Sequence, residues 1–351
     1  MRWSIFLLCL AAVLTLPAAA SGQEPAAASP DAPVAGDAGH LEGPASQPPP
    51  GRQPAAGRQP AAGQVSIKVH GGQSTRKLRY VARGAPVVVV GRSRPFVPGQ
   101  VAVLAVYRRG RLVATRQAGI VQAGDAGQAT FRFKSRRRGL VKLVIRHEGT
   151  AAQSAFSSRA ARMKVVAPRA GQGARGTYVL LLQRGLRRLG FAVPVTGRYD
   201  GGTSRAVLAF RKTNGLGRNR YADRRVFSLV LGGRGAFRVR YPRAGRHVEF
   251  DWSRQVLALI DRGRARRVYH ASSGKPSTPT VFGTFRFYLK QAGTNSKGMV
   301  DSNYFIGGYA IHGFPSVPNY PASHGCIRVP VPNAAAINGQ ISYGETIFVY
   351  R

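Results

Sequence analysis

The sequence has 351 residues, enough for two or three domains, and it is strongly basic. Its 53 Lys and Arg residues outnumber 13 Asp and Glu residues, for a formal net charge of +40. Such a charge attracts polyanions of any kind, although the same excess also fits a compositional bias that leaves only a well-solvated basic surface. After residue 20 no segment is apolar enough to cross a bilayer, so we expect no stable membrane span.

The first 20 residues are expected to be a secretory signal peptide. Arg2 precedes an apolar stretch from Ile5 to Leu16, and Pro17 is followed by three alanines, small residues of the kind that signal peptidase reads. An uncleaved anchor is the alternative, but the run is short for a membrane span and is interrupted by proline. We therefore predict a secreted protein of the cell wall or periplasmic space. Its natural partners would be anionic polymers of the envelope and not nucleic acid.

Removal of the signal peptide would also remove Cys9 and leave Cys326 as the only thiol. An internal disulfide is then excluded. A lone thiol in a secreted chain either bridges to another molecule or is a reactive group.

Two regions of different character follow the signal peptide. Residues 21–64 are rich in Ala, Pro and Gly and contain GRQPAA twice, a composition typical of a disordered, extended linker. Residues 65–168 contain short β-rich runs separated by turn signals, which predicts an immunoglobulin-like β-sandwich. His70 and His147 in this region are expected at the surface.

Residues 173–232 change to a helical period and predict a small three-helix bundle. The first helix falls within 177–190, the second within 199–217 with Thr203 or Ser204 as its N-cap, and the third follows Asp223.

The helical region resembles the peptidoglycan-binding domain built on a three-helix repeat. It differs from that pattern at Arg211, where the family usually has Gln, and at GRNRYAD, where an Asp-Gly turn is common. The resemblance implies glycan as a partner, while a spacer bundle that binds nothing is the alternative. The matching positions are Leu182-Gln183, Leu186, Leu189-Gly190-Phe191, Gly197, Tyr199-Asp200, Thr203, Ala206-Val207, Phe210 and Gly215-Leu216.

Residues 246–351 return to a period of two and predict a second β-rich domain. QVLALI and RRVYHAS, joined by a DRG turn, indicate a hairpin, TFRFYLK indicates one strand, and GETIFVY indicates the last strand. The predicted fold class is therefore multidomain and mainly β.

The candidates for chemistry lie in this last region. A thiol needs a neighbouring imidazole to populate its thiolate, and His312 and His324 both precede Cys326. In an extended strand His324 would share a face with Cys326, whereas His312 is separated from it by a Pro-rich loop. Backbone N–H groups near Gly325 are candidates for an oxyanion hole. A buried inert thiol, a zinc site of these three residues and an intermolecular disulfide remain as alternatives.

The motif AIHG…SHGCIRV resembles the signature of the L,D-transpeptidase (YkuD-type) catalytic domain, over about residues 246–351. The resemblance implies a β-rich catalytic domain with Cys326 as nucleophile and His312 as general base, and it implies no cofactor or metal. Members of this family are acylated by carbapenems. The loop from 313 to 322 is short, and Arg328 stands where many members have Asn. The remaining expected roles are backbone or oxyanion support for Gly313, Ser323, His324 and Gly325, and substrate binding for Tyr304 and Arg328.

The predicted function is that of an exported L,D-transpeptidase acting on peptidoglycan stem peptides and glycan. The resemblance implies attack on the carbonyl between the L-centre of a diamino acid and a terminal D-alanine, followed by transfer to an amine. Transfer to water would make the protein an L,D-carboxypeptidase. A non-catalytic wall-binding protein is the alternative from another class.

Overall fold

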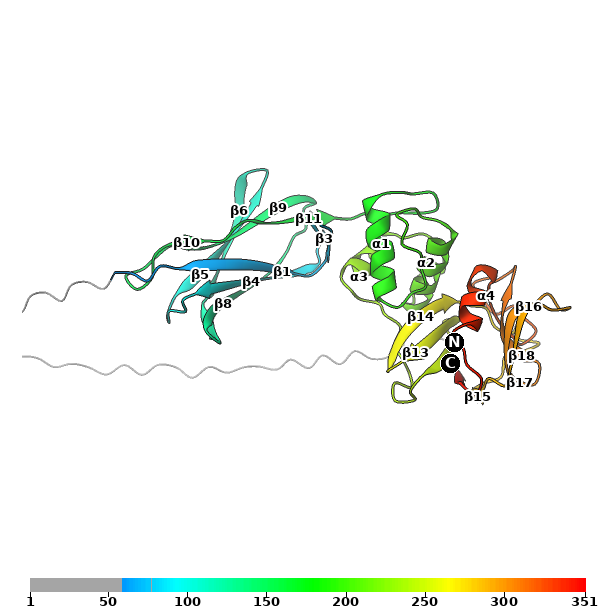
Figure 1. Cartoon of the computed structure of the whole chain (residues 1–351). Helices are drawn as coiled ribbons and strands as arrows, with labels where there is room; N and C mark the ends of the chain where they lie inside the picture. Colours follow the sequence, from blue (N-terminus) through cyan, green and yellow to red (C-terminus); the bar gives the residue numbers. More distant parts are fainter. Residues whose placement is uncertain (1–58, 77) are drawn as a thin grey trace, which may run out of the picture. The chain divides into compact units, whose positions relative to one another are not determined.

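The computed structural model describes residues 59–76 and 78–351, and in this part the chain is mainly β, as predicted (Figure 1). The predicted signal peptide, and the predicted linker up to residue 58, lie outside the described residues. At the end of the predicted linker, Ala61 forms a bridge with Gln153, and the first strand already begins at Gln64. No helix of the described part is long and apolar enough to cross a membrane.

The N-terminal part of the described chain forms two sheets around one apolar core. Buried side chains of both sheets, among them Val89, Leu104, Phe131 and Ile145, belong to one cluster, which is the arrangement of a β-sandwich. The strands of the first sheet, in order, are β1 (Gln64–His70), β4 (Pro86–Arg94), β8 (Ala126–Lys134) and β7 (Val121–Ala123). The strands of the second are β2 (Gln73–Ser74), β3 (Arg79–Ala82), β11 (Ala161–Val166), β9 (Gly139–His147), β5 (Val101–Arg108) and β6 (Arg111–Gly119), with β10 (Phe156–Ser157) beside β9.

The expectation that His147 lies at the surface is wrong. Its side chain is buried, with its Nδ1 2.9 Å from the carbonyl oxygen of Val101 and its ring packed on Phe156. A histidine at the end of a strand can be buried when a carbonyl satisfies one ring nitrogen, and sequence pattern does not reveal that partner.

Three helices follow: α1 (Thr177–Arg188), α2 (Gly201–Thr213) and α3 (Arg224–Leu231). The N-cap of α2 is Asp200 and not Thr203 or Ser204, because its carboxylate accepts a hydrogen bond from the Thr203 backbone N–H at 2.7 Å. Asp223 caps α3 in the same way, through the N–H of Val226.

Two buried polar side chains organise the loops of this bundle. The side-chain oxygen of Gln183 accepts hydrogen bonds from the backbone N–H groups of Thr196 and Gly197 at 3.0 and 2.8 Å. Arg211, which departs from the family pattern, donates to the Gly217 carbonyl and pairs with Asp223 at 2.9 Å. This arginine therefore fixes the connection between α2 and α3 and at the same time holds the carboxylate that caps α3.

The C-terminal part consists of two sheets and one helix. An apolar cluster joins Phe250 of the first sheet, Phe305 and Ile311 of the second, and Ile337 of the helix. The strands of the first sheet, in order, are β14 (Arg264–His270), β13 (Val256–Asp261), β12 (His247–Asp251), β20 (Thr346–Tyr350) and β15 (Gly283–Arg286). The second sheet contains β16 (Leu289–Thr294), β17 (Val300–Ile306), β18 (Tyr309–Phe314) and β19 (Ile327–Pro330), and α4 (Val331–Asn338) packs along it.

The predicted hairpin is confirmed, because β13 and β14 pair antiparallel. The prediction of a single strand over TFRFYLK is wrong: β15 ends at Arg286 and β16 begins at Leu289, in a different sheet. The side chain of Phe287, between them, is fully buried and accounts for the regular alternation that suggested one strand.

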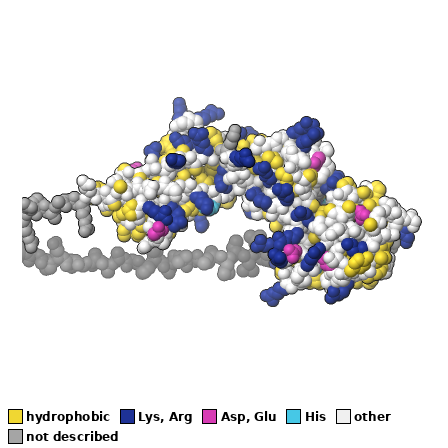
Figure 2. All heavy atoms as spheres, viewed as in Figure 1, with side chains coloured by type: hydrophobic (Ala, Val, Ile, Leu, Met, Phe, Trp, Pro, Cys, Tyr) yellow, Lys and Arg dark blue, Asp and Glu magenta, His cyan; other side chains and the backbone are white. Residues whose placement is uncertain are grey.

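On the face seen in Figure 2, Lys and Arg side chains are spread over the described residues, with few Asp or Glu side chains among them. The basic composition is thus expressed as an exposed charge.

We predict that Gln183→Leu destabilises the helical bundle by about 1–3 kcal/mol, because the substitution removes the buried side-chain oxygen that accepts from the N–H groups of Thr196 and Gly197. Thermal unfolding followed by ellipticity at 222 nm checks this. The matched control is Gln117→Leu at an exposed position of β6, which should change stability by no more than about 0.5 kcal/mol. Equal midpoints for the two variants would contradict the prediction.

Candidate active site

The parallel pairing of β18 with β19 brings the two halves of the sequence motif together. The register places His312 opposite Arg328, so Cys326, directly before β19, lies next to the start of β18. Both His312 and Cys326 line one pocket of about 660 Å³. The other predicted residues at this pocket are Tyr304, Ser323, His324 and Arg328.

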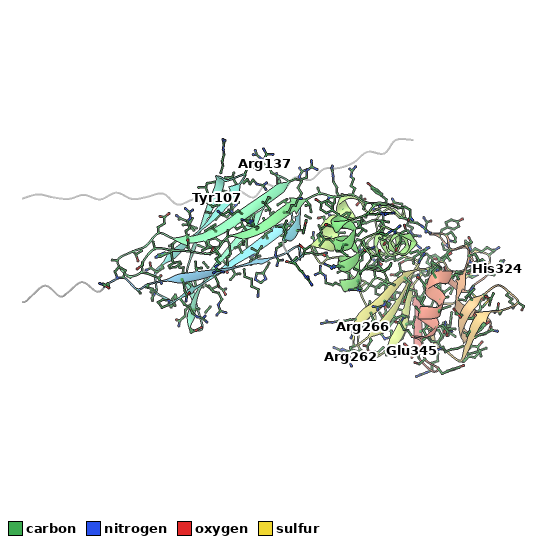
Figure 3. The ribbon with its side chains drawn as sticks, turned by 45° about the horizontal axis from the view of Figure 1, so that its top comes forward. Tyr107, Arg137, Arg262, Arg266, His324 and Glu345 are labelled. Atoms are coloured by element: carbon green, nitrogen blue, oxygen red, sulfur yellow. The ribbon has the colours of Figure 1, made fainter. Side chains whose placement is uncertain are left out.

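The segment from Ser323 to Cys326 is a tight turn and not an extended strand. The Ser323 hydroxyl accepts from the Gly325 N–H at 3.1 Å and donates to the Cys326 carbonyl at 2.5 Å. Thr280 donates to the Gly325 carbonyl at 2.6 Å and fixes the turn from outside. The prediction that His324 and Cys326 share one face of a strand is therefore wrong, and His324 is exposed at the surface (Figure 3).

Only glycine fits at position 325. Its φ of +118° is unfavourable for other residues, and a Cβ atom there would lie 2.2 Å from the ring of Tyr309. The close approach of Tyr309 to the turn thus requires the missing side chain.

His312 is held in one tautomer. Its side chain is 3% exposed, and its Nδ1–H donates to the carbonyl oxygen of Gly313 at 2.9 Å. Burial lowers the pKa of the imidazole, and Arg328 lowers it further, against the opposing effect of the Gly313 carbonyl. The ring is therefore neutral at neutral pH, and Nε2 carries a free lone pair that can accept a proton.

Cys326 is partly buried, and its thiol lies 3.6 Å from the carbonyl oxygen of Gly308. Burial raises the pKa of this thiol, although the Ala310 backbone N–H and the charges of Arg328 and Lys297 partly offset the rise. Both pKa shifts disfavour the charged forms, so a standing thiolate is not favoured in this pocket. The thiolate forms when a proton passes to an acceptor.

The pocket is electropositive. Its lining contains Arg328 and Lys297 but no Asp or Glu. The guanidinium of Arg328 lies 4.0 Å from the ring centre of Phe314, and its buried Nε has no hydrogen-bond partner within the described part of the chain. This pocket is therefore suited to an anionic or electron-rich substrate group.

The sequence motif did not indicate the residues that enter the pocket from the turn between β16 and β17. Asn295 accepts from the backbone N–H groups of Lys297 and Met299, both at 3.0 Å, which shapes this turn over the site. Its side-chain amide also contacts the hydroxyl of Tyr304 at 3.2 Å. Nothing in the local sequence distinguishes these residues from an ordinary polar hairpin turn.

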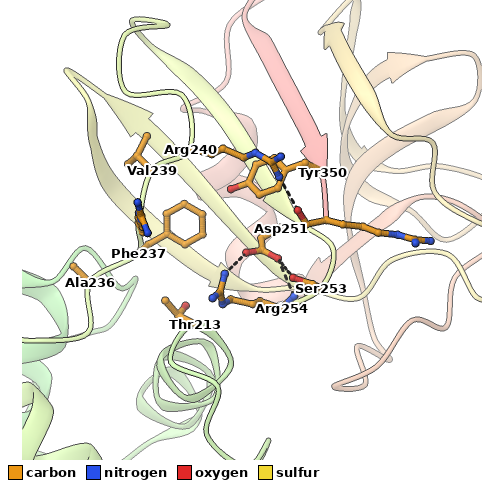
Figure 4. A pocket seen from close by; sticks show the side chains of 11 residues that line it. Thr213, Ala236, Phe237, Val239, Arg240, Asp251, Ser253, Arg254 and Tyr350 are labelled. Carbon is orange, nitrogen blue, oxygen red and sulfur yellow. Dashed lines mark hydrogen bonds and ion pairs between the residues drawn. The ribbon is translucent and has the colours of Figure 1, made fainter. Parts of the chain in front are cut away.

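A second pocket, of about 400 Å³, lies apart from these residues and shares no lining residue with the first (Figure 4). Its polar groups satisfy one another: Asp251 pairs with Arg254 at 2.8 Å and accepts from the Ser253 hydroxyl at 2.7 Å. It contains no histidine or cysteine, so it holds no thiol and imidazole pair. Across residues 59–76 and 78–351, no group of three or more His, Cys, Asp or Glu is placed to hold a metal ion.

Comparison with known proteins identifies both regions. The L,D-transpeptidase catalytic domain (YkuD) matches residues 245–349, and a peptidoglycan binding domain matches residues 175–228. No curated protein matches the chain.

Several solved structures are similar. An L,D-transpeptidase from Xylanimonas cellulosilytica is 33% identical, covers 53% of this chain and 99% of its own, and has a TM-score of 0.48. The catalytic domain of the E. faecium L,D-transpeptidase is 25% identical over 30% of this chain and 98% of its own, with a TM-score of 0.28. An L,D-transpeptidase from Mycobacterium smegmatis is 14% identical over 82% of this chain and 99% of its own, with a TM-score of 0.28. On the evidence of the matched domains and the 33% identity, the chain belongs to the L,D-transpeptidase family, with a peptidoglycan binding domain ahead of its YkuD catalytic domain.

Proposed function

We propose that this peptidoglycan-modifying enzyme is exported and acts as an L,D-transpeptidase through a covalent acyl-enzyme on Cys326. The observation that carries the proposal is the presence, in one pocket, of Cys326 and of a buried His312 whose Nδ1 is engaged by the Gly313 carbonyl. A thiol, a base and a third group that orients the base are the parts that nucleophilic acyl transfer needs.

The first half-reaction begins with transfer of the Cys326 proton to Nε2 of His312. The sulfur attacks the carbonyl carbon between the L-centre of the diamino acid and the terminal D-alanine. The C–N bond breaks, the imidazolium returns the proton to the leaving amine, and D-alanine departs. The product of this half-reaction is a thioester between Cys326 and the stem peptide.

In the second half-reaction, an amine of a neighbouring stem attacks the thioester. His312 removes a proton from that amine, a new amide bond forms, and the thiol of Cys326 is regenerated with the proton. Water in place of the amine gives the L,D-carboxypeptidase reaction. The two activities therefore share every residue of the first half-reaction.

The electrostatics of the site bear on when the proton transfer occurs. The lowered pKa of His312 and the raised pKa of Cys326 disfavour an ion pair in the empty site, so charge develops mainly as the substrate reacts. Arg328 and Lys297 then stabilise the negative charge on sulfur or on the carbonyl oxygen. The Gly325 N–H already donates to the Ser323 hydroxyl. We therefore assign the oxyanion hole to the backbone N–H of Cys326 and to the neighbouring N–H groups of this turn.

We assign substrate binding to Tyr304 and Arg328, which line the pocket beside Cys326. We assign glycan binding to the helical domain and binding of anionic wall polymers to the basic surface. A wall-binding protein without catalysis would share these two features. It would not require the pairing of a neutral imidazole with a thiol in one pocket.

The acyl-enzyme is tested by incubation with a carbapenem and intact-mass measurement. We expect one covalent adduct on the wild-type protein and none on Cys326→Ser. Folded wild-type protein that gains no mass, or a Cys326→Ser protein that still gains it, would show that Cys326 is not the nucleophile.

We predict that His312→Ala slows carbapenem acylation by on the order of a hundredfold, as expected for loss of a general base. Raising the pH should partly restore the acylation rate of this variant, because the thiolate then forms without a base. Since burial raises the pKa of Cys326, this recovery should require a pH above the usual pKa of a thiol. In the wild type, the neutral imidazole persists below its usual pKa of about 6.5, so the rate should fall only at lower pH.

Acylation rates against pH for both histidine variants provide the control. His324 is exposed, and we do not assign it as the proton acceptor. Any loss of acylation rate in His324→Ala should therefore not be recovered at high pH. Recovery at high pH in His324→Ala and not in His312→Ala would reverse the assignment.

The role of the helical domain and of the charge is tested by sedimentation with insoluble peptidoglycan. Exposed charge contacts are screened beyond about 8 Å at physiological salt, so rising salt should release part of the protein. Deletion of residues 173–232 should cause a further loss at any salt concentration. If salt releases all of the protein and the deletion changes nothing, the bundle is a spacer.

A further inference from the structure

The loop of residues 315–322 connects the two ends of the active site. It begins directly after β18, which carries His312, and it ends at Ser323, where the turn to Cys326 starts. A shift of this loop would therefore act on the chain at both ends of the site. The contacts that hold the loop therefore matter for catalysis as well as for folding.

The loop is bound to the helical region through Arg218, which follows α2. Arg218 donates from its guanidinium to the Asn319 carbonyl at 2.7 Å, and the Asn319 side-chain amide donates to the Arg218 carbonyl at 2.7 Å. The same guanidinium also donates to the Ser253 carbonyl at 2.9 Å. This reciprocal pair joins the middle of the loop to the connection between α2 and α3.

A second link runs through a buried lysine. Lys212 of α2 is 2% exposed, and its Nζ lies 2.8 Å from Nδ1 of His270, 2.9 Å from the Ala271 carbonyl and 3.1 Å from the Gln255 carbonyl. Burial lowers the pKa of this amine to about 6, while the three acceptors around it match the three N–H donors of its charged form. Nε2 of His270 lies 3.0 Å from the carbonyl of Val317 in the loop, which can only accept, so the ring proton is on Nε2 and Nδ1 accepts from Lys212.

The helix that carries Lys212 lies against β14, whose last residue is His270 (Figure 1). One residue beyond Ala271, the hydroxyl of Ser272 donates to the Tyr320 carbonyl at 2.6 Å, and the Ser272 backbone pairs with Arg328. The chain that follows β14 thus contacts the loop on one side and the strand after Cys326 on the other.

We propose that the helical domain is a positioning element of the active site, in which Lys212, acting through His270, and Arg218 hold the 315–322 loop and so set Cys326 against His312. This inference rests on the proposed function. It assigns to the helical domain a role that is separate from binding the wall. A small soluble acylating agent, which needs no glycan contact, then still depends on these two side chains.

The test measures carbapenem acylation of the full chain with Lys212→Met and Arg218→Ala. We expect each variant to reduce the maximal acylation rate about tenfold or more, with a smaller change in the half-saturating concentration, because the reacting groups and not the binding surface are displaced. Arg187→Ala, an exposed arginine of α1, is the matched control and should acylate at the wild-type rate. Arg218 is itself exposed, so its variant should fold even if Lys212→Met does not.

Hydrogen exchange distinguishes positioning from a general loss of stability. In both variants, faster exchange should be confined to peptides of residues 315–326, with β12 and β13 protected as in the wild type. Wild-type acylation rates in folded Arg218→Ala and Lys212→Met proteins would overturn the proposal. Equal slowing by Arg187→Ala, or exchange that increases throughout the catalytic domain, would also overturn it. A wild-type protein that forms no adduct would instead contradict the proposed function.

Discussion

The site depends on one constraint, the tight turn that delivers Cys326 to the start of a strand parallel to β18. Parallel pairing fixes the register of His312 against Arg328, and the turn then decides where the thiol lies. A residue with a side chain at position 325 would collide with the ring of Tyr309, so the chain can follow this path only through glycine. The Ser323 hydroxyl accepts from the Gly325 N–H and donates to the Cys326 carbonyl. These two hydrogen bonds restrict the backbone freedom that glycine would otherwise leave.

Burial gives this geometry its chemical character. In water a thiol already has a higher pKa than an imidazole, and here desolvation disfavours both charged forms and widens that difference. A neutral thiol is a weaker nucleophile and is also less exposed to oxidation, since oxidation follows thiolate character. A thiolate that forms only with substrate in place would therefore be reactive during catalysis and resistant to oxidation at other times.

The sequence predicted which residues share a pocket better than it predicted their geometry. Cys326 and His312 belong to a local motif, and the pocket brings them together. The face of His324 could not be predicted, because the turn depends on Thr280 and Tyr309, which lie elsewhere in the sequence.

Other differences have the same physical origin. The break between β15 and β16 is hidden because a buried phenylalanine continues the alternation across it. The positions of Lys297 in the pocket and of Lys212 in the interior could not be predicted from the neighbouring sequence either. A lysine in a polar turn or on a helix normally reads as a solvated charge, and only the packed structure shows which one enters a pocket and which one is buried.

The scarcity of acidic residues links the fold to the electrostatics of the site. Most carboxylates of the described residues are engaged in holding the structure together: they cap helices, close turns or pair with a nearby arginine. Examples are Asp125, Asp200, Asp223, Glu249, Asp251, Asp261 and Glu345. Few are left to neutralise the remaining cations, and none lines the pocket of Cys326. The excess of positive charge therefore extends into the pocket of Cys326, where the charges of Arg328 and Lys297 lower the pKa of the thiol and partly offset its burial.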